Sequence, residues 1–233
     1  MRYQVLAVDY DGTIARDGCV AASTIAALRR ARRANLRLVL VTGRQVDDLL
    51  AVLPELDLFD RVVAENGALL YDPSTRTLRA LAPPPPPELV DRLTALDVPF
   101  STGRSIVATV EPHDHAVSST IRDLGLEWHV IFNKGCVMAL PSGVTKATGL
   151  AAALGELNVP AARTVAVGDA ENDHAFMREC GVAVAVANAL PEVKAEADLV
   201  TRGSDGDGVR EVIDAILAGA VLERADRARR CGF

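Results

Sequence analysis

Two acidic segments hold the residues of this 233-residue chain that are best suited to chemistry. One is Asp9-Tyr10-Asp11-Gly12-Thr13, directly after the apolar run 5–8, and the other runs from Gly168-Asp169 to Asn172-Asp173, after the apolar run 164–167. If both runs are strands of one parallel sheet, the carboxylates converge at its ligand-binding end. Oxygen ligands of this kind suit a hard cation that keeps room for water and phosphate, which favours magnesium (Mg2+).

Each acidic segment also has an ordinary structural interpretation. Asp11-Gly12 is a common pair in a turn that only reverses the chain. Asp169 or Asn172 could serve as the N-cap of the following helix, although capping accounts poorly for the whole second segment.

Two further segments supply donors for an anion. Thr42-Gly43-Arg44 follows the apolar run 36–41 and precedes a helical pattern, a place where backbone N–H groups and a hydroxyl are available to a phosphate. Lys146 lies early in another helical pattern, where a cation is unfavourable unless it faces an anion. Turn chemistry and a solvated surface lysine are the alternatives.

The pattern of elements predicts an α/β fold with a doubly wound parallel sheet. Unbroken apolar strands alternate with amphipathic helices, which is typical of a parallel sheet covered on both faces. The predicted strands are 5–8, 36–41, 61–64, 164–167 and 182–186, and the predicted helices are 21–34, 46–53, 144–157, 172–180 and 208–222.

The middle of the chain predicts a second, smaller unit. After a hairpin-like segment at 68–73, five consecutive prolines at 83–87 form a stiff spacer that suits a domain boundary. Beyond it we expect helices at 88–96 and 114–124 and strands at 105–111, 127–132 and 136–140. The predicted division is a core of residues 1–82 and 143–233 with a small α+β domain, residues 83–142, inserted.

The four chemical segments, in this order, resemble the motifs of the haloacid dehalogenase-like hydrolase superfamily. Asp9-Tyr10-Asp11-Gly12-Thr13 matches the first motif, Thr42-Gly43-Arg44 the second, Lys146 the third, and Gly168-Asp169 through Asn172-Asp173 the fourth. The insertion between the second and third motifs resembles the type II (IIB) cap of Cof-like phosphatases. Its small size and the segment Glu65-Asn66-Gly67-Ala68 are most similar to archaeal-type phosphoglycolate phosphatases and sucrose-phosphate phosphatases.

The resemblance implies a magnesium-dependent phosphomonoester hydrolase. In this family pattern Asp9 is the nucleophile that forms an aspartyl-phosphate, and Asp11 is the general acid and then the general base. Magnesium is bound by Asp9, the backbone carbonyl of Asp11 and Asp169, and Asp173 is a further candidate ligand. Phosphate is bound by a second group of residues: Thr42, Gly43, Arg44, Lys146 and Asn172. Asn172 and Asp173 are also expected to orient Lys146 or metal-bound water.

The cap and the Glu65-Asn66 loop are expected to select the substrate, a small phosphate ester such as phosphoglycolate or a sugar phosphate. The candidate cap residues are Arg104, His113, Trp128, His129 and Lys134, but Trp128 is better suited to the cap core than to the site, and solvent is the alternative for His129. A phosphomutase of the phosphomannomutase type and a non-catalytic regulatory module are the alternatives. The four intact residues Asp9, Asp11, Lys146 and Asp169 speak against the second.

Composition and charge bear on the class of binding partner and on the cell compartment. The net charge of −6, without a basic cluster, argues against a nucleic-acid partner. No apolar run approaches the roughly 20 residues of a membrane span, and charge near the N-terminus does not suit a signal peptide, so a cytoplasmic protein is expected.

Cys19, Cys136, Cys180 and Cys231 show no CxxC pair and are expected to be reduced and mostly buried. Residues 223–230 are expected to extend the last helix or to lead to a further domain, and the oligomeric state stays open.

Overall fold

The computed structural model describes residues 2–220, and its main feature is an eight-stranded sheet in the order β14-β13-β12-β1-β4-β5-β6-β7. All pairs from β14 to β5 are parallel, whereas β6 and β7 are antiparallel. The strands are β1 (Val5–Val8), β4 (Arg37–Val41), β5 (Arg61–Ala64), β6 (Leu69–Asp72), β7 (Thr77–Ala80), β12 (Thr164–Gly168), β13 (Val182–Ala185) and β14 (Leu199–Val200). The α/β fold class is therefore confirmed.

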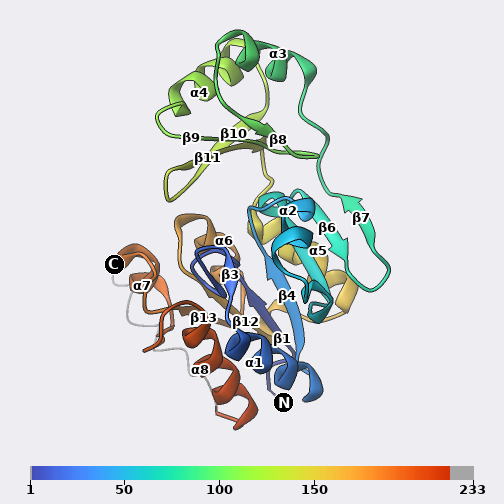
Figure 1. Ribbon diagram of the computed structural model, residues 1–233, viewed down its shortest axis with the longest axis vertical. Coiled ribbons are helices and arrows are strands. Elements are labelled where there is room, and N and C mark those ends of the chain that lie inside the picture. Colours follow the sequence, from blue (N-terminus) through green and yellow to red (C-terminus); the bar gives the residue numbers. More distant parts are fainter. Residues whose placement is uncertain (1, 221–233) are drawn as a thin grey trace, which may run out of the picture.

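Two groups of helices cover opposite faces of this sheet (Figure 1). The chain moves from β1 to β4 in one direction along the sheet and from β12 to β13 in the other, so right-handed crossovers place α1 and α6 on different faces. Helix α8 packs against α1, and α5 packs against α6. The helices are α1 (Ala22–Arg33), α2 (Val46–Val52), α5 (Lys146–Leu157), α6 (His174–Glu179), α7 (Pro191–Glu196) and α8 (Asp205–Leu217).

A smaller layer with its own sheet stands above one end of the large sheet (Figure 1). Its antiparallel strands lie in the order β10-β11-β9-β8, and its helices α3 and α4 pack against each other. The elements are α3 (Pro87–Ala95), β8 (Ser101–Thr102), β9 (Val107–Val110), α4 (Asp114–Asp123), β10 (Trp128–Asn133) and β11 (Cys136–Pro141). We call this layer the cap. The boundaries at 82/83 and 142/143 stay a proposal, supported by the two separate sheets.

Several local predictions were wrong. The last helix begins at Asp205 and ends at Leu217, where Gly219 with φ +75° stops it, rather than covering 208–222. The helix predicted at 172–180 starts at His174 because a 3-10 turn precedes it. Three short features had no signal strong enough to predict, namely β7, α7 and the hairpin of β2 (Ala15–Arg16) and β3 (Cys19–Val20). Residues 221–233, with Cys231, lie outside the described residues.

The expectation of mostly buried thiols is also wrong. Cys19 and Cys136 are exposed and Cys180 is buried, and all three are free cysteines. Each of the two exposed cysteines is the first residue of a strand, directly after a turn: Cys19 begins β3 and Cys136 begins β11. Within residues 2–220, no helix is both long enough and apolar enough to cross a bilayer.

The cap is held to the core through a buried carboxylate. Glu65, in the 3-10 turn Glu65–Gly67 of the core, is 1% exposed. Its two oxygens accept hydrogen bonds from the backbone N–H groups of Arg104 and Ser105 in the cap, at 2.9 and 2.8 Å. A side chain at Gly103 would meet the same carboxylate, at 2.6 Å. One anion of the core therefore fixes the β8–β9 loop of the cap.

Replacing Glu65 by Gln tests this attachment. The amide turns an N–H group toward one of the two backbone donors, so we expect the free energy of unfolding to fall by about 1–3 kcal/mol. Urea unfolding gives the change in stability, and hydrogen exchange at Arg104 and Ser105 reports local release of the cap. Glu88→Gln, at an exposed position of α3, is the matched control. Equal stability and equal exchange in the two variants would contradict the assignment.

Thiol reactivity tests the burial of the cysteines. The thiolate is the reactive form, and burial raises the pKa of Cys180 to about 12. We expect iodoacetamide at pH 8 to modify Cys19 and Cys136 in the native protein and to spare Cys180 until denaturant is added. Peptide mass spectrometry reads each site separately, and rapid native modification of Cys180 would show that its surroundings open readily.

Candidate active site

The predicted site residues gather at the carboxyl ends of three neighbouring strands. Asp9 follows β1, Asp169 follows β12 and Thr42 follows β4. These strands are adjacent, in the order β12-β1-β4, and the crossovers leave β1 toward one side and β12 toward the other. A crevice opens at such a switch point of a parallel sheet, so the topology itself brings the motifs together.

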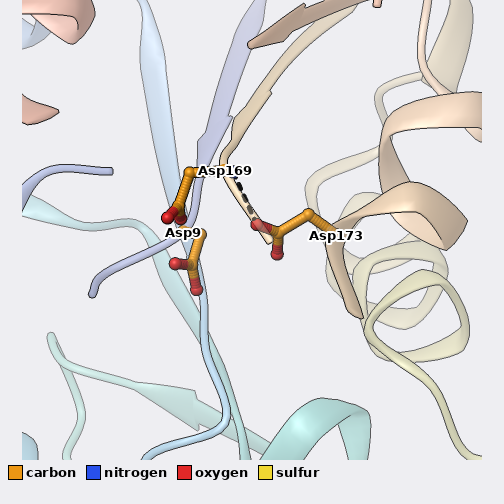
Figure 2. Close-up of side chains that lie close together, drawn as sticks. All are labelled: Asp9, Asp169 and Asp173. Carbon is orange, nitrogen blue, oxygen red and sulfur yellow. Dashed lines mark hydrogen bonds between the residues drawn. The ribbon is translucent and has the colours of Figure 1, made fainter. Parts of the chain in front are cut away.

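Three buried carboxylates form the centre of the site. Asp9 is 4% exposed, and Asp169 and Asp173 are fully buried. One oxygen of each lies within 4.8 Å of the others, and Figure 2 shows the Asp9 and Asp169 carboxylates side by side with Asp173 approaching from the helical side. Burial raises the pKa of Asp9 well above its ordinary value and also raises the pKa of Asp169. Such a cluster needs positive charge.

Lys146 supplies one of these positive charges. Its Nζ donates to Asp9 Oδ1 and to Asp173 Oδ1, each at 2.6 Å, and the side chain is 1% exposed. Burial opposes the charge, but attraction by Asp173 and Asp9 outweighs it and raises the pKa of Lys146. Lys146 is therefore a permanent cation, and its solvated-surface interpretation is wrong.

Close backbone packing brings Lys146 to this position. It is the first residue of α5, behind Thr145, whose side chain caps the helix by accepting from the Thr148 N–H group. Gly149 of the same helix packs on Gly67, where an added Cβ would lie 2.6 Å from the Gly67 Cα. Only the missing side chains of these two glycines let the start of α5 approach the sheet this closely.

Asp173 links Lys146 to the backbone that follows β12. Its Oδ2 accepts from the backbone N–H groups of Asp169 and Ala170, at 2.8 and 3.0 Å, while Oδ1 holds Lys146. The contact with the Asp169 N–H group is the dashed line in Figure 2. Because both oxygens are held by buried partners, the backbone and Lys146, the geometry favours a positioning role for Asp173 over direct metal binding.

Asp11 and Arg44 are paired with each other. Arg44 Nε and Nη2 donate to the two oxygens of Asp11 at 2.7 and 2.9 Å, and the guanidinium stacks over Tyr10, 5.1 Å from the ring centroid. Arg44 was predicted to bind phosphate, and in this structure its donors face Asp11. The Asp11 side chain is 45% exposed, so it borders the site at its open side.

The remaining predicted phosphate ligands line the other side of the site. Thr42 is buried, and its Oγ1 accepts from the Arg44 N–H group at 3.1 Å. Gly43 lies under Met138 of the cap, whose Sδ would be 3.2 Å from an added Cβ. Asn172 donates to Asn66 Oδ1 at 3.0 Å, and its own Oδ1 is buried without a hydrogen-bond partner among the described residues.

Sequence reasoning missed the contacts of two residues that complete the site. Thr13 Oγ1 donates to Asp169 Oδ1 at 2.8 Å, and Thr13 was visible only as the last letter of the first motif. Asn66 had been expected to select substrate, yet it is fully buried and holds Asn172. Glu65, expected in the same role, holds cap backbone instead.

One of the five predicted cap residues reaches the carboxylates. Lys134, in the β10–β11 turn, donates through Nζ to Asp169 Oδ2. Arg104 is exposed and lines a hollow between the start of α2 and the β8–β9 loop. His113 directly precedes α4, Trp128 packs against the hydrophobic cluster of the cap, and His129 is half-buried on β10. The core alternative for Trp128 is thus confirmed.

The residues present fit a hard divalent cation. The carboxylate oxygens of Asp9 and Asp169 lie together, and the unpartnered Asn172 Oδ1 is an acceptor suited to an ordered water nearby. Since Asp173 is engaged by Lys146 and backbone, Asp9 and Asp169 are the two side chains that would hold the ion.

Comparison with known proteins identifies this constellation. The family model for haloacid dehalogenase-like hydrolases matches residues 6–101 and 126–213. The protein belongs to this family. A phosphoglycolate phosphatase of Methanothermobacter thermautotrophicus is 31% identical over 90% of the chain and 97% of its own length. The phosphoglycolate phosphatase of Pyrobaculum aerophilum is 33% identical over 94% and 98%. The protein is accordingly a hydrolase of the phosphatase kind, as the motifs predicted.

Solved structures show the same fold. A haloacid dehalogenase-like hydrolase from Bacteroides thetaiotaomicron superposes with a TM-score of 0.80 over 92% of this chain and 99% of its own, at 21% identity. A sugar phosphatase described as subclass IIB of the superfamily gives a TM-score of 0.75 over 91% and 98%, at 20% identity. The chain therefore shares the fold of these solved structures over almost its whole length.

Removing the Lys146 charge tests the electrostatics of the site. Lys146→Met leaves Asp9 and Asp173 buried without their cation, and we expect the metal-free protein to lose about 3–5 kcal/mol of unfolding free energy. Lys146 lowers the pKa of Asp9, so its removal raises that pKa further, and the loss of stability is smallest at low pH, where Asp9 is protonated, and grows as pH rises. Urea unfolding at pH 5 and pH 8 measures both effects.

The half-exposed Lys194→Met is the matched control for this variant. It is expected to change stability by less than about 0.5 kcal/mol at either pH. A Lys146→Met protein that is as stable as the control, or whose loss of unfolding free energy relative to wild type is larger at pH 5 than at pH 8, would refute the proposed charge balance.

Proposed function

We propose that the protein is a magnesium-dependent phosphomonoester hydrolase that acts through an aspartyl-phosphate on a small phosphorylated acid of the phosphoglycolate type. The observation that carries the proposal is the buried contact between Lys146 Nζ and Asp9 Oδ1 at 2.6 Å. A buried carboxylate held by a fixed ammonium, at the ligand-binding end of the sheet, is a preorganised nucleophile.

Asp9 is the residue that attacks phosphorus. Lys146 holds Oδ1, so we assign the attack to Oδ2, which forms the new O–P bond as the ester O–P bond breaks. Lys146 also faces the incoming phosphoryl oxygens, where a desolvated cation stabilises developing negative charge. Thr42, with its hydroxyl at the end of β4, is the second donor to these oxygens. Bound magnesium would add charge neutralisation between the carboxylates and the phosphate.

Asp11 is the proposed general acid and base. It would protonate the oxygen of the leaving alcohol and then take a proton from the water that hydrolyses the aspartyl-phosphate. Both carboxylate oxygens of Asp11 accept hydrogen bonds from the Arg44 guanidinium. The Arg44 pair must therefore loosen before Asp11 acts, and an arriving phosphate is the anion that can compete for Arg44.

The proposed substrate class rests on the relatives and on the cap. Full-length relatives about 30% identical are named phosphoglycolate phosphatases. The cap brings Lys134 onto the site, which places a cation where a small anionic leaving group would lie. A monosaccharide phosphate is the second candidate substrate, in line with the fold shared with the subclass IIB sugar phosphatase.

Phosphate release with and without the nucleophile tests the function. Wild-type protein with magnesium is expected to release phosphate from phosphoglycolate, and removal of the metal with EDTA is expected to stop the reaction. Asp9→Asn, which keeps the shape and removes the nucleophilic charge, is expected to lose at least about 1,000-fold in kcat. Asp123→Asn, exposed on α4, controls for handling and folding.

Three results would contradict the proposal. They are retained activity in Asp9→Asn, full activity in EDTA, and transfer of phosphate between positions of one sugar with no free phosphate. The last result would indicate a mutase. Trapping of radioactive phosphate on the wild-type chain by rapid acid quench, and its absence from Asp9→Asn, checks the aspartyl-phosphate directly.

A further inference from the structure

Lys134 occupies an unusual place in the cap. It is the first residue of the two-residue turn that joins β10 to β11, and the flanking residues Asn133 and Cys136 pair across the hairpin. Lys134 has φ +47° and Gly135 has φ +83°, the backbone of a type I′ turn. Asn, Asp or Gly is preferred at the first of these positions, and a lysine there is conformationally costly. The hairpin extends down from the cap toward the core (Figure 1).

The side chain of Lys134 reaches into the carboxylate cluster. Its Nζ donates to Oδ2 of the fully buried Asp169 and would lie 2.9 Å from a Cβ added to Gly12. Burial opposes the charge, but the hydrogen bond to Asp169 and the attraction of Asp9 and Asp173 outweigh it and raise the pKa of Lys134. Among the cap residues that the structure describes, Lys134 alone forms an ion pair with the core.

This contact competes with the proposed metal. Asp169 has one oxygen on Thr13 and the other on Lys134, so both of its oxygens are in use. A divalent cation that binds Asp169 would meet the ammonium at close range, and like charges repel. Asp9 and Asp173 share Lys146, which is held from two sides and is 1% exposed. Lys134, with 43% of its side chain exposed, is therefore the cation that leaves.

We propose that Lys134 has two successive partners: Asp169 in the metal-free protein and, once a divalent cation takes Asp169, the carboxylate of the substrate's leaving group. The inference rests on the proposed function for its second half. The type I′ turn keeps the displaced ammonium above the site, on the cap side and opposite the phosphate-binding residues of the core. An anionic leaving group is thereby selected over a neutral one of the same size.

The first test measures metal binding without turnover. Mn2+ binding is followed by electron paramagnetic resonance at pH 7.5, in the absence of substrate, for wild type, Lys134→Met and Lys194→Met. Removal of the competing ammonium is expected to tighten Mn2+ binding by about tenfold or more, within the range of typical site coupling. The Lys194 variant is expected to match wild type. Equal or weaker binding in Lys134→Met overturns the competition.

The second test measures selectivity at saturating magnesium. Phosphoglycolate and ethyl phosphate present leaving groups of similar size with and without a carboxylate. For Lys134→Met, the ratio of their kcat/KM values is expected to fall by about 10- to 100-fold, the loss of one charge-assisted hydrogen bond. Lys134→Arg is expected to keep part of the wild-type ratio. The control Lys194→Met is expected to keep the full wild-type ratio. An unchanged ratio overturns the leaving-group assignment.

The two tests separate this inference from the proposed function. If wild type hydrolyses neither ester, the proposed function fails and the leaving-group half fails with it. The Mn2+ measurement still decides the competition at Asp169, because it needs no catalysis.

Discussion

The site depends on one electrostatic constraint: three carboxylates are buried within contact distance of one another and must be neutralised. Asp9, Asp169 and Asp173 bring three negative charges, whereas Lys146 is the one cation buried with them in the described part of the chain. A buried charge without a partner is far more costly than an exposed one. The excess negative charge therefore attracts further cations, either Lys134 from the cap or a divalent ion from solution, and this competition links the cap to the metal.

The rest of the core serves to hold that charge cluster in place. Parallel strands β12, β1 and β4 end at the same edge, so backbone geometry alone places Asp169, Asp9 and Thr42 together. Lys146 needs additional help, because it comes from a helix rather than a strand. The glycine contact between Gly67 and Gly149 and the Thr145 cap bring that helix start into position. A single side chain added at Gly67 or Gly149 would therefore push the start of α5 away and displace the Lys146 ammonium from the carboxylates.

The sequence alone was sufficient to place site residues that directly follow a strand or open a helix. The placement of Asp9, Asp169 and Lys146 in one site was predictable because their motifs follow apolar strands or open a helix in the family order. Two placements were beyond sequence reasoning. The pairing of Arg44 with Asp11 depends on a side-chain rotamer, and the contact of Lys134 with Asp169 depends on how the cap docks. Cys19 and Cys136 were misjudged because each begins a strand directly after a turn, where the apolar pattern does not show which side chains are exposed.

The manner of cap attachment explains how the substrate can be selected independently of the fold. Glu65 binds backbone N–H groups of Arg104 and Ser105, which every residue except proline provides. The side chains of Arg104 and of the β10–β11 turn are thus free to change without loss of this docking contact, whereas Gly103, which packs on Glu65, is not. Arg104 already points to an open hollow and Lys134 to the carboxylates. Separate groups therefore perform docking and selection, and a substitution at Lys134 acts on charge recognition while Glu65 still holds the cap in place.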